Sequence, residues 1–346
     1  MASIDVVVPN YQYGRFLRGC VSSILSQGIA DARVIIIDNA STDDSLAVAR
    51  RLASEDRRVE VVEHQKNLGH LASFNEGIDL ARADYFMILC SDDMLAPGSL
   101  RRAITFMERN DDVNLTFGRE FVIDSDSPKR RPDLETSEGN WQILSGRQLR
   151  EVLCRTGRPD ASRFMIAGTT AIVRTAAQKR VGYYRQNLPH TSDLEIWLRF
   201  SCVGQAAMTD AIQGIRRVHP TNRSASLIDC HAWNLHWEDA FESFFANEGQ
   251  QLDDARRLRR MARRALSDRA YWGFLSNALR GDMRLALKLL RYSLSRQPAT
   301  MILPPIGYLF QHSDTFERIV GALAGAARRW SSVAGSRPIE GSSADR

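Results

Sequence analysis

The stretch Tyr85-Phe86-Met87-Ile88-Leu89-Cys90-Ser91-Asp92-Asp93 runs from an apolar strand directly into two adjacent carboxylates. Apolar strands do not normally finish in paired acids, because two carboxylates held close together repel and need a cation or a proton beside them. The tip of a strand in an open α/β sheet is also where ligands usually bind. An acidic pair there is the usual arrangement for holding a divalent metal against a phosphate. The alternative interpretation is an Asp-Asp turn and helix cap before Pro97, since aspartate favours both roles.

The first ninety residues around this stretch alternate between strand and helix signals. Strands are expected at Ile4–Val8, Val34–Ile37, Val59–Val62 and Tyr85–Leu89, and helices at Phe16–Leu25, Leu46–Leu52 and Leu71–Ala81. Such apolar strands separated by helices indicate an α/β fold with a mostly parallel sheet that is covered by helices on both faces. Further along, the pattern predicts a strand at Gly168–Val173 and a helix at Leu194–Val203.

The chain divides into three expected parts. Residues 1–225 form the α/β domain, in which the polar segment 124–140 is expected to be a loop. Residues 226–330 form a helical C-terminal extension, because 231–296 carry helical periodicity with arginine-rich polar faces. Residues 331–346 consist of serine, glycine and charged residues and are expected to be disordered.

Composition narrows the classes of protein and partner. The 346 residues carry a formal charge of +5, spread along the chain rather than gathered in one basic run, so nucleic acid is not indicated as a partner. Five scattered cysteines without metal-ligand spacing argue for a reducing compartment. No apolar run approaches the roughly 18 to 20 residues that span a bilayer, and a strand begins almost at the N-terminus. The sequence therefore predicts a cytoplasmic protein, with contact to the inner face of the membrane as the alternative location.

Every early strand ends in a polar signature. The first ends Val8-Pro9-Asn10-Tyr11, the second ends Ile37-Asp38-Asn39-Ala40-Ser41-Thr42-Asp43, the third is followed by Asn67-Leu68-Gly69-His70, and the fourth by Ser91-Asp92-Asp93. In a parallel sheet these ends meet at one edge, where acids can accept from a base or a ribose and an aromatic ring can stack. No phosphate-binding glycine loop of the P-loop or dinucleotide type is present, so metal would have to bind the phosphate. This disfavours kinases and dehydrogenases.

These motifs together resemble family 2 glycosyltransferases, over about residues 3 to 225. The resemblance implies a GT-A fold and transfer of a sugar from a nucleotide-sugar with inversion. It implies that Pro9, Tyr11 and Asp38 hold the nucleoside, with Asp43 and Asn67 at the border of that pocket. It further implies that Asp92 and Asp93 correspond to the metal-binding DXD-type motif. The chain departs from the fuller family pattern at Cys90, where an aspartate is common, which leaves open which carboxylate contacts the ribose.

The second half of the sequence contains a matching base motif. The segment His190-Thr191-Ser192-Asp193-Leu194-Glu195-Ile196-Trp197-Leu198-Arg199 starts a helix with an acid in its first turn, where the helix dipole favours negative charge. The plain interpretation is that Ser192 or Asp193 caps the helix. The family resemblance instead makes Asp193 the general base that deprotonates the acceptor hydroxyl. Glu195 points to a different face and is expected to pair with an arginine.

A third segment, Arg216-Arg217-Val218-His219-Pro220, also resembles the family. By that resemblance His219 completes the metal site, with a surface or core histidine as the alternative. Arg217 would face the leaving diphosphate. Elsewhere, the arginine-rich run Arg256–Arg264 is most simply a solvated helix face, but together with apolar Met301–Phe310 it could dock on an anionic membrane.

The sequence therefore predicts an inverting, metal-dependent glycosyltransferase. It would use Mg²⁺ or Mn²⁺ and a nucleoside-diphosphate sugar, with UDP as the first expectation for the nucleotide. The acceptor would be a glycan or a lipid-linked oligosaccharide in surface polysaccharide or glycoconjugate synthesis, and the helical extension offers a surface for homodimerisation. Two alternatives are a non-catalytic nucleotide-binding scaffold and a sugar nucleotidyltransferase. The latter would need a glycine-rich basic loop where this chain has Pro9-Asn10-Tyr11.

Overall fold

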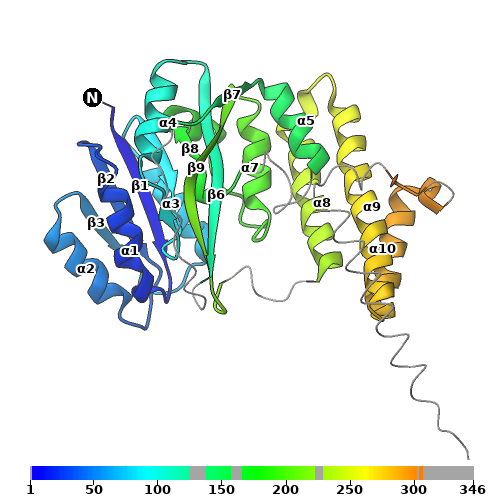
Figure 1. Ribbon diagram of the computed structural model, residues 1–346, viewed down its shortest axis with the longest axis horizontal. Helices are drawn as coiled ribbons and strands as arrows, with labels where there is room; N and C mark the ends of the chain where they lie inside the picture. The colour runs from blue at the N-terminus through cyan, green and yellow to red at the C-terminus, as the bar shows by residue number, and fades with distance from the viewer. Residues whose placement is uncertain (1, 125–137, 157–165, 223–228, 302–303, 307–346) are drawn as a thin grey trace, which may run out of the picture. The chain divides into compact units, whose positions relative to one another are not determined.

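The computed structural model of the protein is shown in Figure 1. It describes residues 2–124, 138–156, 166–222, 229–301 and 304–306. The chain forms two compact units. The first combines residues 1–227 with 239–259, and the second combines 228–238 with 260–346. Most of the loop expected at 124–140 and the whole of the tail 331–346 lie outside the described residues.

The first unit is built on a sheet whose first half is parallel, as the sequence predicts. Strands β1 (Ile4–Asn10), β2 (Ala32–Asp38), β3 (Val59–Glu63) and β4 (Tyr85–Ile88) lie in the order β3-β2-β1-β4. All three pairings are parallel, and Val6 of β1 lies in register with Val34 on one side and Met87 on the other. The carboxyl ends of these strands therefore reach the same edge of the sheet.

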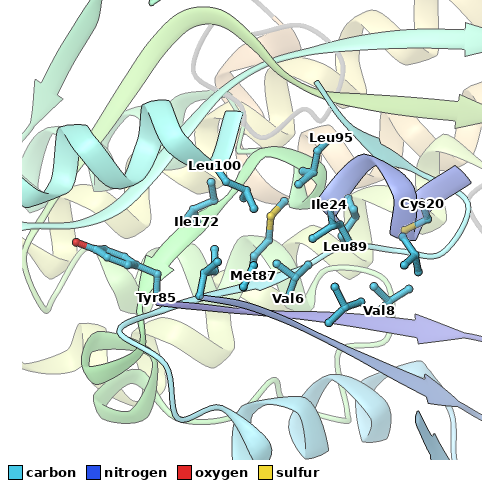
Figure 2. Close-up of a cluster of buried hydrophobic side chains, with 14 of the residues drawn as sticks. Val6, Val8, Cys20, Ile24, Tyr85, Met87, Leu89, Leu95, Leu100 and Ile172 are labelled. Atoms are coloured by element: carbon cyan, nitrogen blue, oxygen red, sulfur yellow. The ribbon is translucent and has the colours of Figure 1, made fainter. Parts of the chain in front are cut away.

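Helices cover both faces of this half-sheet. Helices α1 (Gly14–Leu25), α2 (Ser45–Glu55) and α4 (Ser99–Glu108) share one buried core with one face of β1, β2 and β4. Figure 2 shows part of this core, with Val6, Met87 and Leu89 beside Ile24 of α1 and Leu100 of α4. Helix α3 (His70–Leu80) covers the opposite face. It approaches so closely that a Cβ on Gly77 would lie 2.6 Å from Val7 Cγ1, so only glycine fits there.

The second half of the sheet is mixed, and much of it was not expected from the sequence. Strand β5 is Met94–Leu95, β6 is Val113–Asp124, β7 is Trp141–Leu144, β8 is Ile172–Arg174 and β9 is Gln205–Val218. Strand β6 pairs parallel with β9, whereas β8 is antiparallel to β4 and β6, and β5 and β7 are antiparallel to β9. Strands β6 and β9 were not expected because both interrupt their apolar residues with Gly, Arg, Glu, Gln or Asp.

One predicted strand was placed too early. The segment Gly168–Thr170 is a 3₁₀ turn, and the strand that follows it is β8. The expected strand Gly168–Val173 therefore begins as a turn, and only its last two residues belong to β8. Helices α5 (Gly146–Thr156), α6 (Thr175–Val181) and α7 (Ser192–Phe200) complete the described α/β part.

The regular secondary structure described after β9 is helical, as predicted for 231–296. Helix α8 is Cys230–Ala246, α9 is Ala255–Leu279 and α10 is Met283–Arg296. Helices α8 and α9 each contribute residues to both units. Among the described residues, no helix is both long enough and apolar enough to cross a membrane.

Candidate active site

Polar side chains from the ends of β1 and β2 are tied together at the carboxyl edge of the sheet. The carboxylate of Asp38 is buried and accepts from Asn10 Nδ2 at 2.9 Å and from the Ser41 backbone N–H at 3.0 Å. Gln12 and Ala40, in the loops after these two strands, have left-handed φ angles of 63° and 60°. Non-glycine residues rarely adopt this conformation, and it concentrates at functional sites. The loops that follow β1 and β2 are therefore held in a defined conformation at this edge of the sheet.

Two other predicted nucleoside contacts lie at the end of β1. Pro9 is in the strand, opposite Ile37 of β2. Tyr11 follows the strand and is 45% exposed. An exposed ring beside a buried carboxylate is the arrangement that a base needs in order to stack and to donate its N–H groups.

Asp43 has a structural task as well as its predicted place at the pocket border. Its carboxylate accepts from the backbone N–H groups of Gly14 at 3.1 Å and Ser45 at 3.1 Å. Burial opposes ionisation, but the hydrogen bonds from Ser45 and Gly14 prevail and lower the pKa of Asp43. Asp43 therefore holds the start of α1 against the loop after β2.

A chain of side chains supports the predicted border residue Asn67. Asn39 donates from Nδ2 to Asn67 Oδ1 at 2.9 Å, and its own Oδ1 accepts from the Leu68 backbone N–H at 2.8 Å. The same Oδ1 lies 2.9 Å from Nδ1 of His64, whose Nε2 lies 2.5 Å from Glu76 Oε2. The loop after β3 is therefore fixed by His64 through Asn39.

The acid pair lies in the connection between β4 and β5 and does not cap a helix. Asp92 and Asp93 are 8% and 7% exposed. The Asp93 backbone N–H donates to Cys90 O at 3.0 Å, so the pair sits in a tight turn that leads into β5. Helix α4 begins only at Ser99. Burial and the charge of Asp92 raise the pKa of Asp93 to about 8, as expected for neighbouring carboxylates without a cation.

The end of β9 lies against this acid pair. Arg217 donates from its backbone N–H to Asp93 Oδ1 at 2.9 Å and from Nε to the Asp92 carbonyl at 3.1 Å. The guanidinium of Arg217 also lies over the ring of Phe16, 4.7 Å from its centroid. The structure thus places Arg217 where it shapes the acid turn.

His219 is brought directly to Asp92. Its Nε2 lies 3.3 Å from Asp92 Oδ2, and the same oxygen accepts from Asn222 Nδ2 at 2.9 Å. The His219 side chain is 1% exposed, and its other ring nitrogen lies 2.9 Å from Thr221 Oγ1. The ring of Tyr13 packs against His219 at a centroid distance of 5.1 Å. His219 is therefore not a surface histidine, and its place in the metal site stays a prediction beside the alternative of a core histidine.

Asp193, the predicted general base, lies on helix α7. It lies in the first turn of α7, whose N-cap is Thr191, so neither Ser192 nor Asp193 is the cap. Cys90 keeps contact with solvent, yet the protein around its thiol raises its pKa, as do the charges of Asp92, Asp93 and Asp193. The charge of Asp193 therefore acts on Cys90, the first residue of the acid turn, and the role of Asp193 as base stays a prediction.

Glu195 has the structural role expected for it. Its side chain is fully buried, and it pairs with Arg199 at 2.8 Å and with Arg185. Arg199 also donates to the Val181 carbonyl at 2.5 Å and to the Tyr183 carbonyl at 2.7 Å. The two acids of the base motif therefore differ in environment: Asp193 is exposed, whereas Glu195 is buried.

The residues at the acid pair fit a divalent cation that is shared with a ligand. Among the described residues, no three His, Cys, Asp or Glu side chains are grouped so that they could hold a metal ion by themselves. Mg²⁺ is commonly bound through one or two carboxylates, with substrate phosphates and water as the other ligands. The Ser91 hydroxyl, next to Asp92 in the chain, and Asn10 Oδ1, at the end of β1, are buried and have no hydrogen-bond partner within the described part of the chain. Buried polar atoms of this kind call for a ligand or a water.

Sequence reasoning missed the residues that orient the predicted ones. Asn39 and Asn222 occur within the quoted motifs or next to them, but their partners come from distant segments. His64 and Asn39 are 25 residues apart, and Asn222 and Asp92 are 130 residues apart. The one available signal was the excess of asparagine at strand ends.

Known proteins share this fold. TarS of S. aureus (residues 1–349, in complex with UDP-GlcNAc) matches with a TM-score of 0.61 and 13% identity over 98% of this chain and 93% of that one. Mannosyltransferase PcManGT from Pyrobaculum calidifontis, in complex with GDP-Man and Mn²⁺, matches with a TM-score of 0.53 and 16% identity, over 94% and 86%. Identities this low establish the fold alone, and that fold is the GT-A fold of glycosyltransferases.

Sequence comparison adds the family. The family model described as "Glycosyl transferase family 2" matches residues 5–177. The chain belongs to this family. Chondroitin synthase of Escherichia coli is 25% identical over 67% of this chain and 31% of its own length. Glycosyltransferase GlyG of Streptococcus pneumoniae is 35% identical over 35% of this chain and 40% of its own. The chain spans 31% to 44% of the length of five curated relatives that it matches.

Proposed function

We propose that this chain is an inverting glycosyltransferase, which moves a sugar from a nucleoside-diphosphate sugar to a hydroxyl group of an acceptor. The observation that carries the proposal is the turn Cys90–Asp93. Asp92 of this turn is contacted by His219, and the charge of Asp193 acts on Cys90, the first residue of the turn. A metal-diphosphate ligand and a general base can therefore act on one sugar.

The nucleoside would bind at the edge formed by β1 and β2. Tyr11 would stack on the base, while Pro9 and the Asp38 carboxylate would line the base and ribose, and Asp43 and Asn67 would border the pocket. One structural neighbour binds UDP-GlcNAc and another binds GDP-Man, and we retain UDP as the first expectation. The hydrogen bonds that Asp38 accepts from Asn10 and Ser41 support this assignment, because they hold the two carboxylate oxygens of Asp38 in a fixed direction.

A divalent cation, Mg²⁺ or Mn²⁺, would be held by Asp93 and Asp92, with His219 beside them. When bound, it would neutralise negative charge on the departing diphosphate as a Lewis acid. Arg217 and Asn222 keep the two carboxylates in position through their contacts to the turn. One neighbour contains Mn²⁺, which agrees with this assignment.

The transfer itself would need one proton acceptor. The Asp193 carboxylate takes the proton of the acceptor hydroxyl as that oxygen forms a bond to the anomeric carbon. The bond between the anomeric carbon and the diphosphate oxygen breaks on the opposite side, and the diphosphate leaves with the electron pair. The anomeric configuration inverts, and no covalent intermediate with the enzyme forms.

The acceptor is proposed to be a glycan or a lipid-linked oligosaccharide in surface polysaccharide or glycoconjugate synthesis. Location in the cytoplasm or at the inner face of the cell membrane, and homodimerisation, stay predictions. A nucleotide-binding scaffold without transfer activity is the competing function, and the Asp193 variant described in the Discussion distinguishes the two.

Nucleotide binding is expected to depend on the metal and on the acid pair. In a thermal-shift panel of UDP, GDP, dTDP and CDP with and without Mn²⁺, we expect one nucleotide to stabilise the protein only when Mn²⁺ is present. A ligand of the folded state adds about 2.7 kcal/mol at a hundredfold excess over its dissociation constant. Asp93→Asn should abolish the Mn²⁺-dependent part of the shift and leave the melting temperature of the ligand-free protein close to that of the wild type. If folded protein shifts with none of the four nucleotides, the donor site is wrong.

His64 is expected to affect donor affinity without touching the donor. Replacing His64 with alanine frees Asn39, which then holds the loop of Asn67 and Leu68 less firmly. The loss of one such hydrogen bond, about 1 to 1.5 kcal/mol, predicts a rise of roughly tenfold in KM for the donor with little change in kcat. Glu76→Gln keeps an oxygen acceptor for the ring and should have a smaller effect. If His64→Ala lowered both kcat and the melting temperature but left KM for the donor unchanged, the positioning role of His64 would be contradicted.

A further inference from the structure

Helix α10 carries two apolar stripes, and the second unit buries only one of them. The buried stripe includes Ala286, Leu289 and Ser293, and it contacts α9 through a hydrogen bond of 3.1 Å from Ser267 Oγ to the Ser293 carbonyl. The second stripe has the same helical spacing of three and four residues. Its members are Met283, Leu287, Leu290 and Leu294.

Solvent reaches the second stripe. Met283 is 51% exposed and Leu287 is 45% exposed, while Leu290 and Leu294 are half-buried. Leu279, at the end of α9 next to this stripe in sequence, is 43% exposed. Single exposed apolar residues are ordinary, but a stripe at helical spacing is a surface that can bury itself against something else.

Cations border this stripe on one side. Arg284, Lys288 and Arg291 are exposed and fall next to it on the helical wheel, again at spacings of four and three. None of the three has an ion-pair partner among the described residues, and α10 contains no acid. The nearest acid along the chain, Asp282, caps the helix by accepting from the Leu285 backbone N–H at 3.0 Å.

We propose that α10 docks on an anionic lipid surface through this face, which we call the α10 stripe. It consists of Met283, Leu287, Leu290 and Leu294 with Arg284, Lys288 and Arg291. The helix would lie in the plane of the headgroups, with the leucines and Met283 entering the edge of the hydrocarbon layer and the cations meeting lipid phosphates. This deepens the membrane contact expected from the sequence and does not depend on sugar transfer.

The α10 stripe suits this role better than the arginine-rich run Arg256–Arg264 does. In that run, Arg257 pairs with Glu151 and Asp254, Arg259 pairs with Glu242, and Arg264 lies 3.9 Å from Asp268. Paired arginines have already satisfied part of their charge, so they attract lipid phosphates less. The other half of the expected membrane contact, Met301–Phe310, lies mostly outside the described residues.

The charge beside the apolar residues favours an anionic lipid surface over two other binding partners, namely a second copy of the chain and the segment 307–346. A second copy of the chain packed on the same stripe by two-fold symmetry would bring Arg284, Lys288 and Arg291 near their own counterparts, and like charges repel. The segment 307–346 of this chain has five arginines against four carboxylates. It therefore offers no net negative charge to complement three cations, whereas an anionic lipid surface does.

Vesicle flotation with the full chain and without any donor tests the proposal. The probes are vesicles of phosphatidylcholine alone and of equal parts phosphatidylcholine and phosphatidylglycerol. We expect binding to the anionic vesicles only, weakening as salt is raised. The triple variant Arg284→Ser/Lys288→Ser/Arg291→Ser should lower partitioning about a hundredfold, since each basic residue near the surface contributes about fivefold. Leu287→Glu should lower it about tenfold or more.

Matched variants in the first unit control for the change in net charge and for the loss of an exposed leucine. Arg57→Ser/Arg101→Ser/Arg109→Ser removes three other exposed arginines, and Leu80→Glu changes another exposed leucine; both should bind vesicles like the wild type. Four results would each overturn the proposal. They are a folded wild type that ignores anionic vesicles, equal losses in the two triple variants, a Leu287→Glu protein that still binds, and a wild-type dimer that Leu287→Glu converts to monomer. Because no sugar nucleotide is used, failure here leaves the proposed transfer untouched, and failure of transfer leaves this binding untouched.

Discussion

Replacing Asp193 with asparagine is expected to lower kcat for sugar transfer by a factor of about 10² to 10⁴, the usual contribution of a positioned general base. The amide keeps the shape of the side chain but cannot take the proton of the acceptor hydroxyl. Donor binding should be unchanged, because the nucleotide and the metal are assigned to the edge of β1, β2 and β4. The measurement is transfer under saturating donor, together with the thermal shift by the nucleotide.

A matched control comes from a second exposed acid at a helix start. Asp44 is the N-cap residue of α2 and makes no side-chain capping hydrogen bond. Asp44→Asn therefore removes the same charge from a comparable position, and we expect near wild-type transfer. For Asp193→Asn, wild-type turnover would refute the role of base and favour the scaffold function. If it lost donor binding and turnover together, the assignment of Asp193 to the proton step alone would fail.

The sequence predicted the parallel half of the sheet well for a physical reason. Strands such as Val34–Ile37 are buried on both faces, so almost every residue is apolar and the strand is visible without knowledge of its neighbours. Strand β9 contrasts with this, since it contains Asp210, Gln213 and Gly214, which are explained only by contacts with distant segments: Asn140, Arg102 and Thr169 respectively. Gly214, for example, passes so near Thr169 that a Cβ would lie 2.5 Å from its carbonyl oxygen.

The candidate site was predictable to the same extent as the strands that carry it. Asp38 and Asp92 were located from sequence because a polar residue directly after a buried strand must lie at the sheet edge. The residues that orient them could not be located in this way. Asn222 and His64 act through contacts made across long stretches of chain, and a single sequence contains no signal for such contacts. Asp193 and His219 were identified only by family resemblance, and the structure brings His219 to Asp92.

The second large effect is expected two residues after Asp193 in the same helix. Replacing Glu195 with alanine should lower the free energy of unfolding of the first unit by about 3 to 5 kcal/mol, because it leaves a buried arginine without its partner. Glu195 is fully buried, and Arg199 is 4% exposed. Burial outweighs the attraction of Arg199 and Arg185 and raises the pKa of Glu195. The penalty of burying the two charges thus offsets much of their attraction. Removing only one of the two charged side chains is therefore destabilising, because the other charge stays buried without a partner.

Two further variants turn this argument into a measurement by urea unfolding. In Glu195→Leu/Arg199→Met both charges are gone, so we expect much of the lost stability to return, with a remaining deficit because the Val181 and Tyr183 carbonyls lose their donor. Glu55 of α2 also contacts two arginines, Arg18 and Arg51, but at an exposed position, and Glu55→Ala should change stability little. If Glu195→Ala were as mild as Glu55→Ala, the buried pair would not hold α7. If the double variant were less stable than the single one, the charge left unpaired would not be the cause. Since α7 carries Asp193, a destabilised Glu195 variant that retains donor binding but transfers slowly at moderate temperature would connect this ion pair to the position of the base.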